Sequence, residues 1–434
     1  MSLPTAAAGS TPSSHGRATR AGVQVGRLRS RVSSAWAELF VAAFGLFLCT
    51  GLAEGLAASE FRLVKHGFYA LIMCLLLLRW QATLRVATRD WALCLFAGLL
   101  LSSALWSEQP FWAFKRAAVM VQTAGFGLYL ASRFSLNEQL RALSAVLVLA
   151  LLTFVASALL DPVGAFATPG HEGAFRGPLA HKNEAGRLMA LAIPVLLLRV
   201  GGAPRQRVLM GCALVVAALF LVLSRSLGGL LVAAMLCSVV VVHRFLRPLG
   251  AGLLLLPTLT VAVGSAAAIA GLLDGVLTAL GKDPTLTGRT DIWSHSMRLL
   301  SERPLLGHSM ASFWQLDIVE QTGIWFSNAH NGYLQLLIDL GLVGLAVFVF
   351  QLLTTLVRSL RWTQLRDRAA LWPYCVAAFV LVYNLFEVSL AEENSIVWVL
   401  YVSASLAVRS PAARRPAVGA APRPRTHASR GVRA

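Results

Sequence analysis

Two arginine residues stand where a helix is expected to begin, which is an unusual place for a cation. Arg225 separates two apolar runs, and Arg289 opens an amphipathic segment that ends before Pro304. The positive end of the helix dipole makes a cation in the first turn mildly unfavourable. A bound anion removes this conflict, because free N–H groups, the dipole and a guanidinium fork together form a phosphate site. The positions of Arg225 and Arg289 therefore predict that both bind one phosphate-containing anion.

A histidine at the start of another apolar run is a candidate base. His330 lies where the long tenth run begins, and the dipole there disfavours the charged imidazolium. A neutral imidazole can act as general base on a hydroxyl group. Further candidates for substrate binding on the same face are Arg116, Arg176, His181, Lys182 and Asn183.

Each of these residues also has a simpler interpretation. Arg225 can extend to lipid phosphates, and Arg289 can be a solvated residue of a loop helix. A histidine at a helix start is often a capping or interfacial residue. Arg116, near Glu108 and Lys115, can belong to a structural ion pair or to the rim of a site. On the residues alone, these alternatives stay open.

Apolar runs of helix length fill most of the chain and must position these candidates. Hydrophobic residues make up 57% of the 434 residues and charged residues 13%, about half the charged fraction of a soluble domain. We therefore expect an all-α polytopic membrane protein with about twelve transmembrane helices. The expected spans are residues 36–58, 63–80, 90–106, 112–132, 139–160, 183–200, 206–223, 227–245, 249–273, 330–357, 369–388 and 394–409.

The connections between these spans alternate in charge. Arg-rich connections, such as those at Arg85 and Arg205, alternate with connections that carry carboxylates, such as Glu108 and Asp283. The positive-inside rule assigns the Arg-rich set to the cytoplasm. Both termini are then cytoplasmic, and the candidate residues lie on the outer face.

Three segments make up the expected domain organisation. Residues 1–34 and 410–434 are basic, disordered cytoplasmic tails, and residues 35–409 form the membrane domain. Two outer loops, 161–182 and 274–329, are too long to be simple turns, and long loops often carry function. In the second loop we expect an amphipathic helix from 288 to 302, with one apolar face, and a short helix at 310–321. The residues expected on that apolar face are Ile292, Trp293, Met297 and Leu300.

The composition also excludes two classes of site. The net charge of +18 comes from Arg residues in short loops and tails, where they set topology, so we expect no nucleic-acid partner. The six Cys residues lie in apolar runs without ligand spacing, so we expect no metal site and no cofactor.

At residues 180–350 the motifs resemble the O-antigen ligase and polymerase superfamily of bacterial envelope glycosyltransferases. No single motif is specific, but six stand in the right order and on the expected face. A seventh piece, Leu105-Trp106-Ser107-Glu108 with Arg116, also matches the family. The six are Phe175-Arg176-Gly177 with His181-Lys182-Asn183, Ser224-Arg225-Ser226, Gly288-Arg289-Thr290-Asp291-Ile292-Trp293, Pro304-Leu305-Leu306-Gly307, Ala329-His330-Asn331-Gly332-Tyr333 and Asp339-Leu340-Gly341-Leu342-Val343-Gly344.

The resemblance implies a membrane glycosyltransferase of the bacterial inner membrane, active on the periplasmic face. Such proteins move a saccharide from a polyprenyl diphosphate such as undecaprenyl diphosphate onto a saccharide or lipid-linked acceptor, without a metal. Carried over by position, Arg225 and Arg289 bind the diphosphate and His330 activates the acceptor hydroxyl. Membrane lipid and a chain-length regulator protein are the further partners to expect.

Two questions of function remain open at the level of sequence. His181-Lys182-Asn183 looks more like the exopolysaccharide-polymerase branch, in exopolysaccharide or O-antigen biosynthesis, than like the ligases of lipopolysaccharide biosynthesis, which transfer glycan to lipid A–core. The rival class is a transporter of an anionic or lipid-linked substrate. A twelve-span carrier usually has its long loop inside and its ionisable residues near the midplane, unlike this chain.

Overall fold

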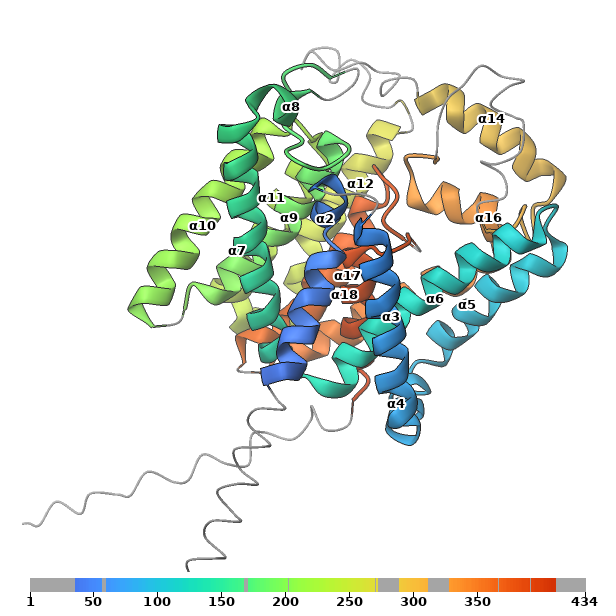
Figure 1. The fold of residues 1–434 in the computed structure, drawn as a ribbon, viewed down its shortest axis with the longest axis horizontal. Coiled ribbons are helices and arrows are strands. Elements are labelled where there is room, and N and C mark those ends of the chain that lie inside the picture. The colour runs from blue at the N-terminus through green and yellow to red at the C-terminus, as the bar shows by residue number, and fades with distance from the viewer. Residues whose placement is uncertain are drawn as a thin grey trace, which may run out of the picture.

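The structure is a computed structural model that describes residues 36–56, 60–167, 171–201, 203–269, 271, 289–310, 328–365, 367–390 and 392–410 (Figure 1). Within these ranges the ordered elements are helices and turns, and no strand occurs. The expected all-α fold is therefore confirmed. Both tails, except Ser410, and most of the expected loop at 274–329 lie outside the described residues, as does the short helix expected at 310–321.

Helices cover each of the expected spans. They are Trp36–Leu48, α2 Leu52–Leu56, α3 Glu60–Leu78, α4 Trp80–Ala87, α5 Trp91–Ser102, η1 Ser103–Trp106, α6 Pro110–Arg133, α7 Leu136–Leu160, α8 Pro162–Phe166, α9 Lys182–Arg199, α10 Pro204–Leu223, α11 Leu227–Leu246, η2 Arg247–Leu249, η3 Ala251–Leu254, α12 Leu255–Ile269, α14 Arg289–Glu302, α16 Gly332–Trp362, η5 Arg368–Leu371, α17 Trp372–Tyr383 and α18 Ile396–Ala407.

Fewer helices than expected have the length and composition of a membrane span. Among the described residues five qualify, or six if the bent pair α3–α4 counts as one span. Four apolar helices are shorter, including α17 and α18. Helix α9 is long enough but carries four charged residues, Lys182, Glu184, Arg187 and Arg199. The count of twelve crossings therefore stays a prediction.

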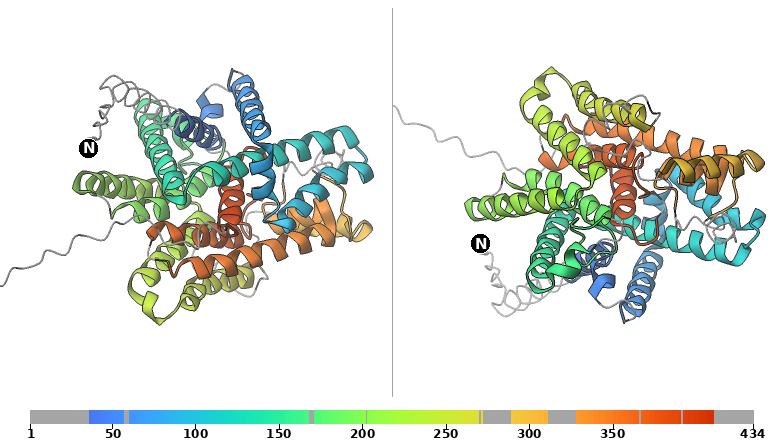
Figure 2. Two further views of the ribbon diagram at one scale, coloured as in Figure 1. Left: turned by 90° about the horizontal axis from the view of Figure 1, so that it is seen from below. Right: turned by 90° about the horizontal axis from the view of Figure 1, so that it is seen from above.

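The shortest apolar helices lie in the middle of the bundle. Nearly every residue of α17 and α18 is buried, as expected for helices that are hydrophobic all round. Helix α18 packs on α6 and α17, and α17 also packs on α11 and α16. Figure 2 shows these C-terminal helices in red among the other elements. The loop between α17 and α18 is consequently held by helices from several parts of the chain.

Helix α16 breaks at Gly341, and a distant segment fills the break. Gly341 has a φ of +62°, and a Cβ added there would lie 2.3 Å from the carbonyl carbon of Leu305. The amides of Leu342 and Val343 donate to the carbonyls of Pro304 and Leu305 at 2.9 and 3.1 Å. Two of the motifs noted in the sequence, at 304–307 and 339–344, are thus one structural unit.

A third motif joins this unit. The indole N–H of Trp106 donates to Leu306 O at 3.1 Å, and Ser309 Oγ donates to Ser107 Oγ at 2.7 Å. Arg303 pairs with Glu108 at 2.9 Å. The motif at 105–108 therefore anchors the end of α14 to the end of η1.

The amphipathic helix of the second outer loop is confirmed, with one correction. Helix α14 begins at Arg289 and buries Ile292 and Leu300, but Met297 is 54% exposed. Helix α14 packs against α16, and within the expected apolar face Met297 is the residue that stays exposed. Helix α14 therefore positions Arg289 close to His330, just before the start of α16.

Candidate functional site

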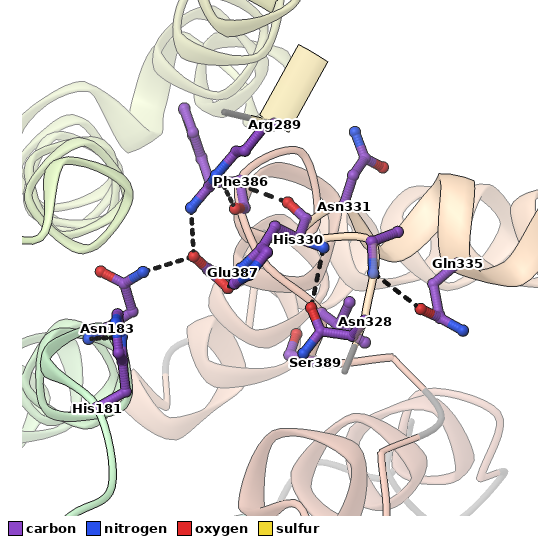
Figure 3. Close-up of polar contacts among 12 residues, drawn as sticks. His181, Asn183, Arg289, Asn328, His330, Asn331, Gln335, Phe386, Glu387 and Ser389 are labelled. Atoms are coloured by element: carbon purple, nitrogen blue, oxygen red, sulfur yellow. Dashed lines mark hydrogen bonds and ion pairs between the residues drawn. The ribbon is translucent and has the colours of Figure 1, made fainter. Parts of the chain in front are cut away.

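The carboxylate of Glu387, in the loop between α17 and α18, stands at the centre of a polar cluster (Figure 3). One oxygen, Oε2, lies 3.0 Å from Nδ1 of His330. The other, Oε1, accepts from Nη2 of Arg289 at 2.6 Å and from Nδ2 of Asn183 at 2.5 Å. The structure therefore brings together three sequence candidates that are far apart in the chain.

The electrostatics of the cluster favour an ionised carboxylate. Burial raises the pKa of Glu387, but the hydrogen bond with His330 and the positive charge of Arg289 lower it more, so its pKa lies below the usual 4.5. An ionised Glu387 accepts the Nδ1 proton of His330. The lone pair of a neutral ring is then on Nε2, and the carboxylate stabilises the imidazolium that forms when Nε2 takes a proton.

The backbone holds His330 in an uncommon conformation. Its φ is +47°, in the left-handed region, which non-glycine residues rarely adopt. Asn328 Oδ1 accepts from the His330 amide at 2.9 Å, and the indole N–H of Trp293 donates to Ala329 O at 2.9 Å. Such conformations cost about 1–3 kcal/mol and cluster at functional sites.

Asn331, not His330, caps α16. Its Oδ1 accepts from the amides of Tyr333 and Leu334 at 3.0 and 3.1 Å. His330 therefore precedes the helix instead of lying in its first turn.

The loop that carries Glu387 is fixed by Asn384. Its Oδ1 accepts from the amides of Ser389 and Leu390 at 2.9 and 3.1 Å, and its carbonyl accepts from the Gly332 amide at 2.8 Å. A Cβ added at Gly332 would lie 2.3 Å from Asn384 Oδ1. The first residue of α16 and the loop of Glu387 are therefore in direct contact, which sets the distance between His330 and Glu387.

Arg225 lies in the turn between α10 and α11, next to the cluster. Its φ is +50°, its side chain is exposed, and Nη1 donates to Glu172 O at 3.4 Å. A Cβ added at Gly228 would lie 2.9 Å from Cβ of Phe386, the neighbour of Glu387. The first turn of α11, which follows Arg225, thus packs against the Glu387 loop.

Both arginines border the same segment. Arg225 contacts the backbone of Glu172, while the charge of Arg289 contributes to lowering the pKa of the adjacent His171, after burial and Lys182. The predicted convergence of Arg225 and Arg289 on one anion remains a prediction. Arg289 also donates to Glu387 and to Phe386 O, so its observed contacts support the cluster.

The three residues at the start of α9 have different positions. His181 is the N-cap of α9, Lys182 is its first residue, and Asn183 donates to Glu387. The ring of His171 lies edge-on to that of His181, with centroids 5.8 Å apart.

The two remaining candidates make contacts away from His330. Arg176 donates to the carbonyls of Gly164 and Leu179 at 3.2 and 3.0 Å, which closes the segment before α9. Arg116 pairs with Glu393 at 3.3 Å. Both residues therefore have structural contacts, and nothing in these contacts links them to the cluster.

Glu387 itself was missed as a site residue by sequence reasoning. The carboxylates nearest the outer ends of other expected spans, Glu184, Glu392 and Glu393, are the bases that the sequence offers after His330. Glu392 instead pairs with Arg187 at 2.6 Å, and Glu393 with Arg116. Glu387 falls at the end of the expected span 369–388, and the sequence gives no signal that it pairs with His330. Among the described residues no group of three His, Cys, Asp or Glu side chains could hold a metal ion.

Comparison with known proteins places these residues in a family context. A family model described as O-antigen ligase matches residues 211–349, which include Arg225, Arg289 and His330. The chain is 27% identical over 237 residues to the exopolysaccharide production protein ExoQ of Rhizobium meliloti (strain 1021), covering 50% of this chain and 54% of that protein. The match thus spans about half the length of this curated relative.

These matches agree with the apolar helices of a multi-pass membrane protein. They confirm the resemblance drawn from the motifs: the chain is similar to the O-antigen ligase and polymerase superfamily, near its exopolysaccharide-production branch.

Proposed function

We propose that this protein is a glycosyltransferase that moves a saccharide from a polyprenyl diphosphate onto a saccharide acceptor. The observation that carries the proposal is the contact of His330 with Glu387, beside Arg289. An ionised carboxylate on Nδ1 can stabilise the imidazolium that forms when Nε2 takes a proton. Two guanidinium groups would suit a diphosphate if Arg225 and Arg289 converge on it as predicted.

The residues can divide the reaction between them. The acceptor hydroxyl oxygen attacks the anomeric carbon of the donor while His330 Nε2 takes the hydroxyl proton. The bond between the anomeric carbon and the diphosphate oxygen breaks, and the electron pair leaves on the diphosphate. Arg225 and the N–H groups of Arg289 that face away from Glu387 hold the developing negative charge.

The reaction needs one proton acceptor, His330, and no second titratable group to protonate the leaving diphosphate. A polyprenyl diphosphate is an anionic leaving group at neutral pH, so it needs charge stabilisation instead of a proton. Glu387 is then a partner of His330 in the reaction and does not touch the sugar. This assignment gives Arg289 two roles, since it neutralises Glu387 on one side and binds the donor on the other.

We further propose the location that goes with this chemistry. The twelve expected spans would cross the inner membrane with both termini in the cytoplasm, so that the Glu387 cluster faces the periplasm. Lipid-linked donors could then reach it from the outer leaflet. The charge pattern of the connections is the support for this orientation.

Polymerisation of exopolysaccharide or O-antigen units is the favoured reaction, with ligation to lipid A–core as the alternative. The similarity to an exopolysaccharide production protein favours the polymerase. The matching family model is described as O-antigen ligase, so ligation is retained as the alternative reaction.

Deletion of the gene, followed by analysis of secreted polysaccharide and of lipopolysaccharide on a gel, separates these activities. Loss of long polysaccharide chains with unchanged capping of lipid A–core supports a polymerase. Intact chains that stay on the lipid carrier support a ligase. Unchanged polysaccharide and lipopolysaccharide would contradict both.

A further inference from the structure

Helix α9 begins with a histidine cap whose ring must be neutral. His181 has φ −139° and ψ 150°, and its Nδ1 accepts from the amide of Asn183 at 3.2 Å. A nitrogen that accepts a hydrogen bond carries no proton, so the ring proton is on Nε2. Histidine is not among the residues preferred as N-caps, which are Asn, Asp, Ser and Thr. Its presence here calls for a physical explanation.

The first turns of α9 hold the loop of Glu387. Asn183 donates to Glu387 Oε1, and one turn later Arg187 Nη1 donates to Val388 O at 3.3 Å and to Glu392. The hydroxyl of Tyr383, at the end of α17, donates to Asn183 O at 3.1 Å. The start of α9 and the loop after α17 are therefore cross-linked on both sides of Glu387.

We propose that His181 is a positioning residue, which caps α9 in its neutral form and through Asn183 holds Glu387 against His330. The capping role stands on geometry alone. The consequence for saccharide transfer rests on the function proposed above.

The charged groups around His181 make the cap sensitive to pH. Those that face it are Glu387 from the α17–α18 loop, His171 from the segment before α9, Lys182 from α9 and His330 before α16. Burial lowers the pKa of His181 most, Glu387 raises it, and the other three groups lower it. The net direction is downward from 6.5.

The sign of the pH effect follows from this direction. A histidine whose folded pKa is depressed stabilises the folded state above its ordinary pKa, and this contribution is lost as pH falls through the folded pKa. Protonation of Nδ1 removes the acceptor for the Asn183 amide. The first turn of α9 should then lose hydrogen-bond protection when His181 is protonated. A cap that does not titrate, at the same position, should keep this protection.

The test compares three forms of the full-length protein in detergent by hydrogen exchange with mass spectrometry. The forms are the wild type, His181→Ala and His181→Asn, each measured at about pH 7.5 and about pH 5.5 with correction for intrinsic rates. Loss of an N-cap should speed exchange in the first turn of α9 by about fivefold in His181→Ala at both values of pH. His181→Asn should keep the protection of the wild type at about pH 7.5 at both values, and the wild type should lose protection only as the pH falls through the depressed pKa of His181.

Polysaccharide made in a gene-deletion strain that carries each variant gives the second readout. His181→Asn should restore most of the wild-type amount and His181→Ala much less. Full protection in His181→Ala overturns the cap. Protection without polysaccharide in His181→Asn overturns the positioning role, because the ring itself would then be required. If the wild-type gene restores no polysaccharide, the proposed function fails while the exchange data still decide the cap.

Discussion

At the scale of single residues, Glu387 joins a candidate base to a candidate anion ligand. Its two oxygens contact different partners, His330 on one side and Arg289 with Asn183 on the other. Glu387→Gln keeps the shape and one acceptor oxygen but removes the charge that stabilises the imidazolium. We expect transfer to fall by about 100-fold or more, since general-base catalysis contributes about 10²–10⁴-fold.

The measurement for Glu387→Gln is the rate of saccharide transfer by purified protein. Glu108→Gln is the matched control, because Glu108 pairs with Arg303 and not with the cluster. Transfer within a few fold of the wild type in Glu387→Gln would show that the carboxylate only supports the fold.

The two arginines should respond differently to replacement by lysine. Arg225 is exposed and contacts one backbone carbonyl, so Arg225→Lys should lower transfer without lowering thermal stability. Arg289 is 19% exposed and donates to Glu387 and Phe386 O, so Arg289→Lys should lower both. A point charge cannot reproduce a bidentate guanidinium, and we expect about a tenfold loss of transfer in each.

The different responses of Arg225 and Arg289 are checked by measuring saccharide transfer and thermal unfolding of the two lysine variants. Full transfer in both would leave a general electrostatic role for these cations. Equal loss of thermal stability in both would contradict the assignment of Arg225 to the ligand alone.

The sequence predicted part of the candidate site from the positions of residues along the chain and not from their contacts. A cation at the start of a helix, or a histidine at the start of an apolar run, can be recognised from the sequence alone. Arg225, Arg289 and His330 could therefore be selected. Glu387 has no such signal, because carboxylates are ordinary in short outer loops, and its pairing with His330 depends on a contact across 57 residues.

At the scale of elements, the break in α16 depends on a glycine that no other residue can replace without strain. Gly341→Ala adds a Cβ at a φ of +62° and within 2.3 Å of the Leu305 backbone. We expect a loss of stability of about 2 kcal/mol or more. The loss of stability is measured by thermal unfolding in detergent. Gly211→Ala is the control, because a Cβ added at Gly211 of α10 meets nothing within 4 Å.

A Gly341→Ala variant as stable as the control would show that the segment 304–308 does not hold the break rigidly. The sequence predicted α14 and α16 from their patterns. It could not show that the motifs at 105–108, 304–307 and 339–344 contact one another, because hydrogen bonds between distant backbone groups leave no periodic pattern.

At the scale of the whole molecule, the orientation of the cluster is testable by labelling. Val163 of α8 is 82% exposed and belongs to an expected outer segment, while Arg205 is exposed and belongs to an expected cytoplasmic connection. With the six native Cys residues replaced, Cys at position 163 should react with a membrane-impermeant thiol reagent in spheroplasts. Cys at position 205 should react only after lysis, and the reverse pattern would place the cluster on the cytoplasmic side.

Hydropathy predicted where the helices lie but did not fix how many cross a membrane. The central helices α17 and α18 are apolar because they are buried by protein, so their composition alone does not show a membrane span. Of the four charged residues of α9, Arg187 contacts the Glu387 loop through Val388 O and pairs with Glu392.

The central claim is that His330 is the base for transfer from a lipid diphosphate, and one comparison tests it most directly. Purified His330→Ala is assayed for saccharide transfer and, separately, for binding of the lipid-diphosphate donor, beside His66→Ala, which changes an exposed histidine of α3. We predict that His330→Ala loses transfer by about 10²–10⁴-fold and still binds donor, while His66→Ala resembles the wild type. Near-normal transfer by His330→Ala, or loss of donor binding as complete as in the Arg225 and Arg289 variants, would contradict the account.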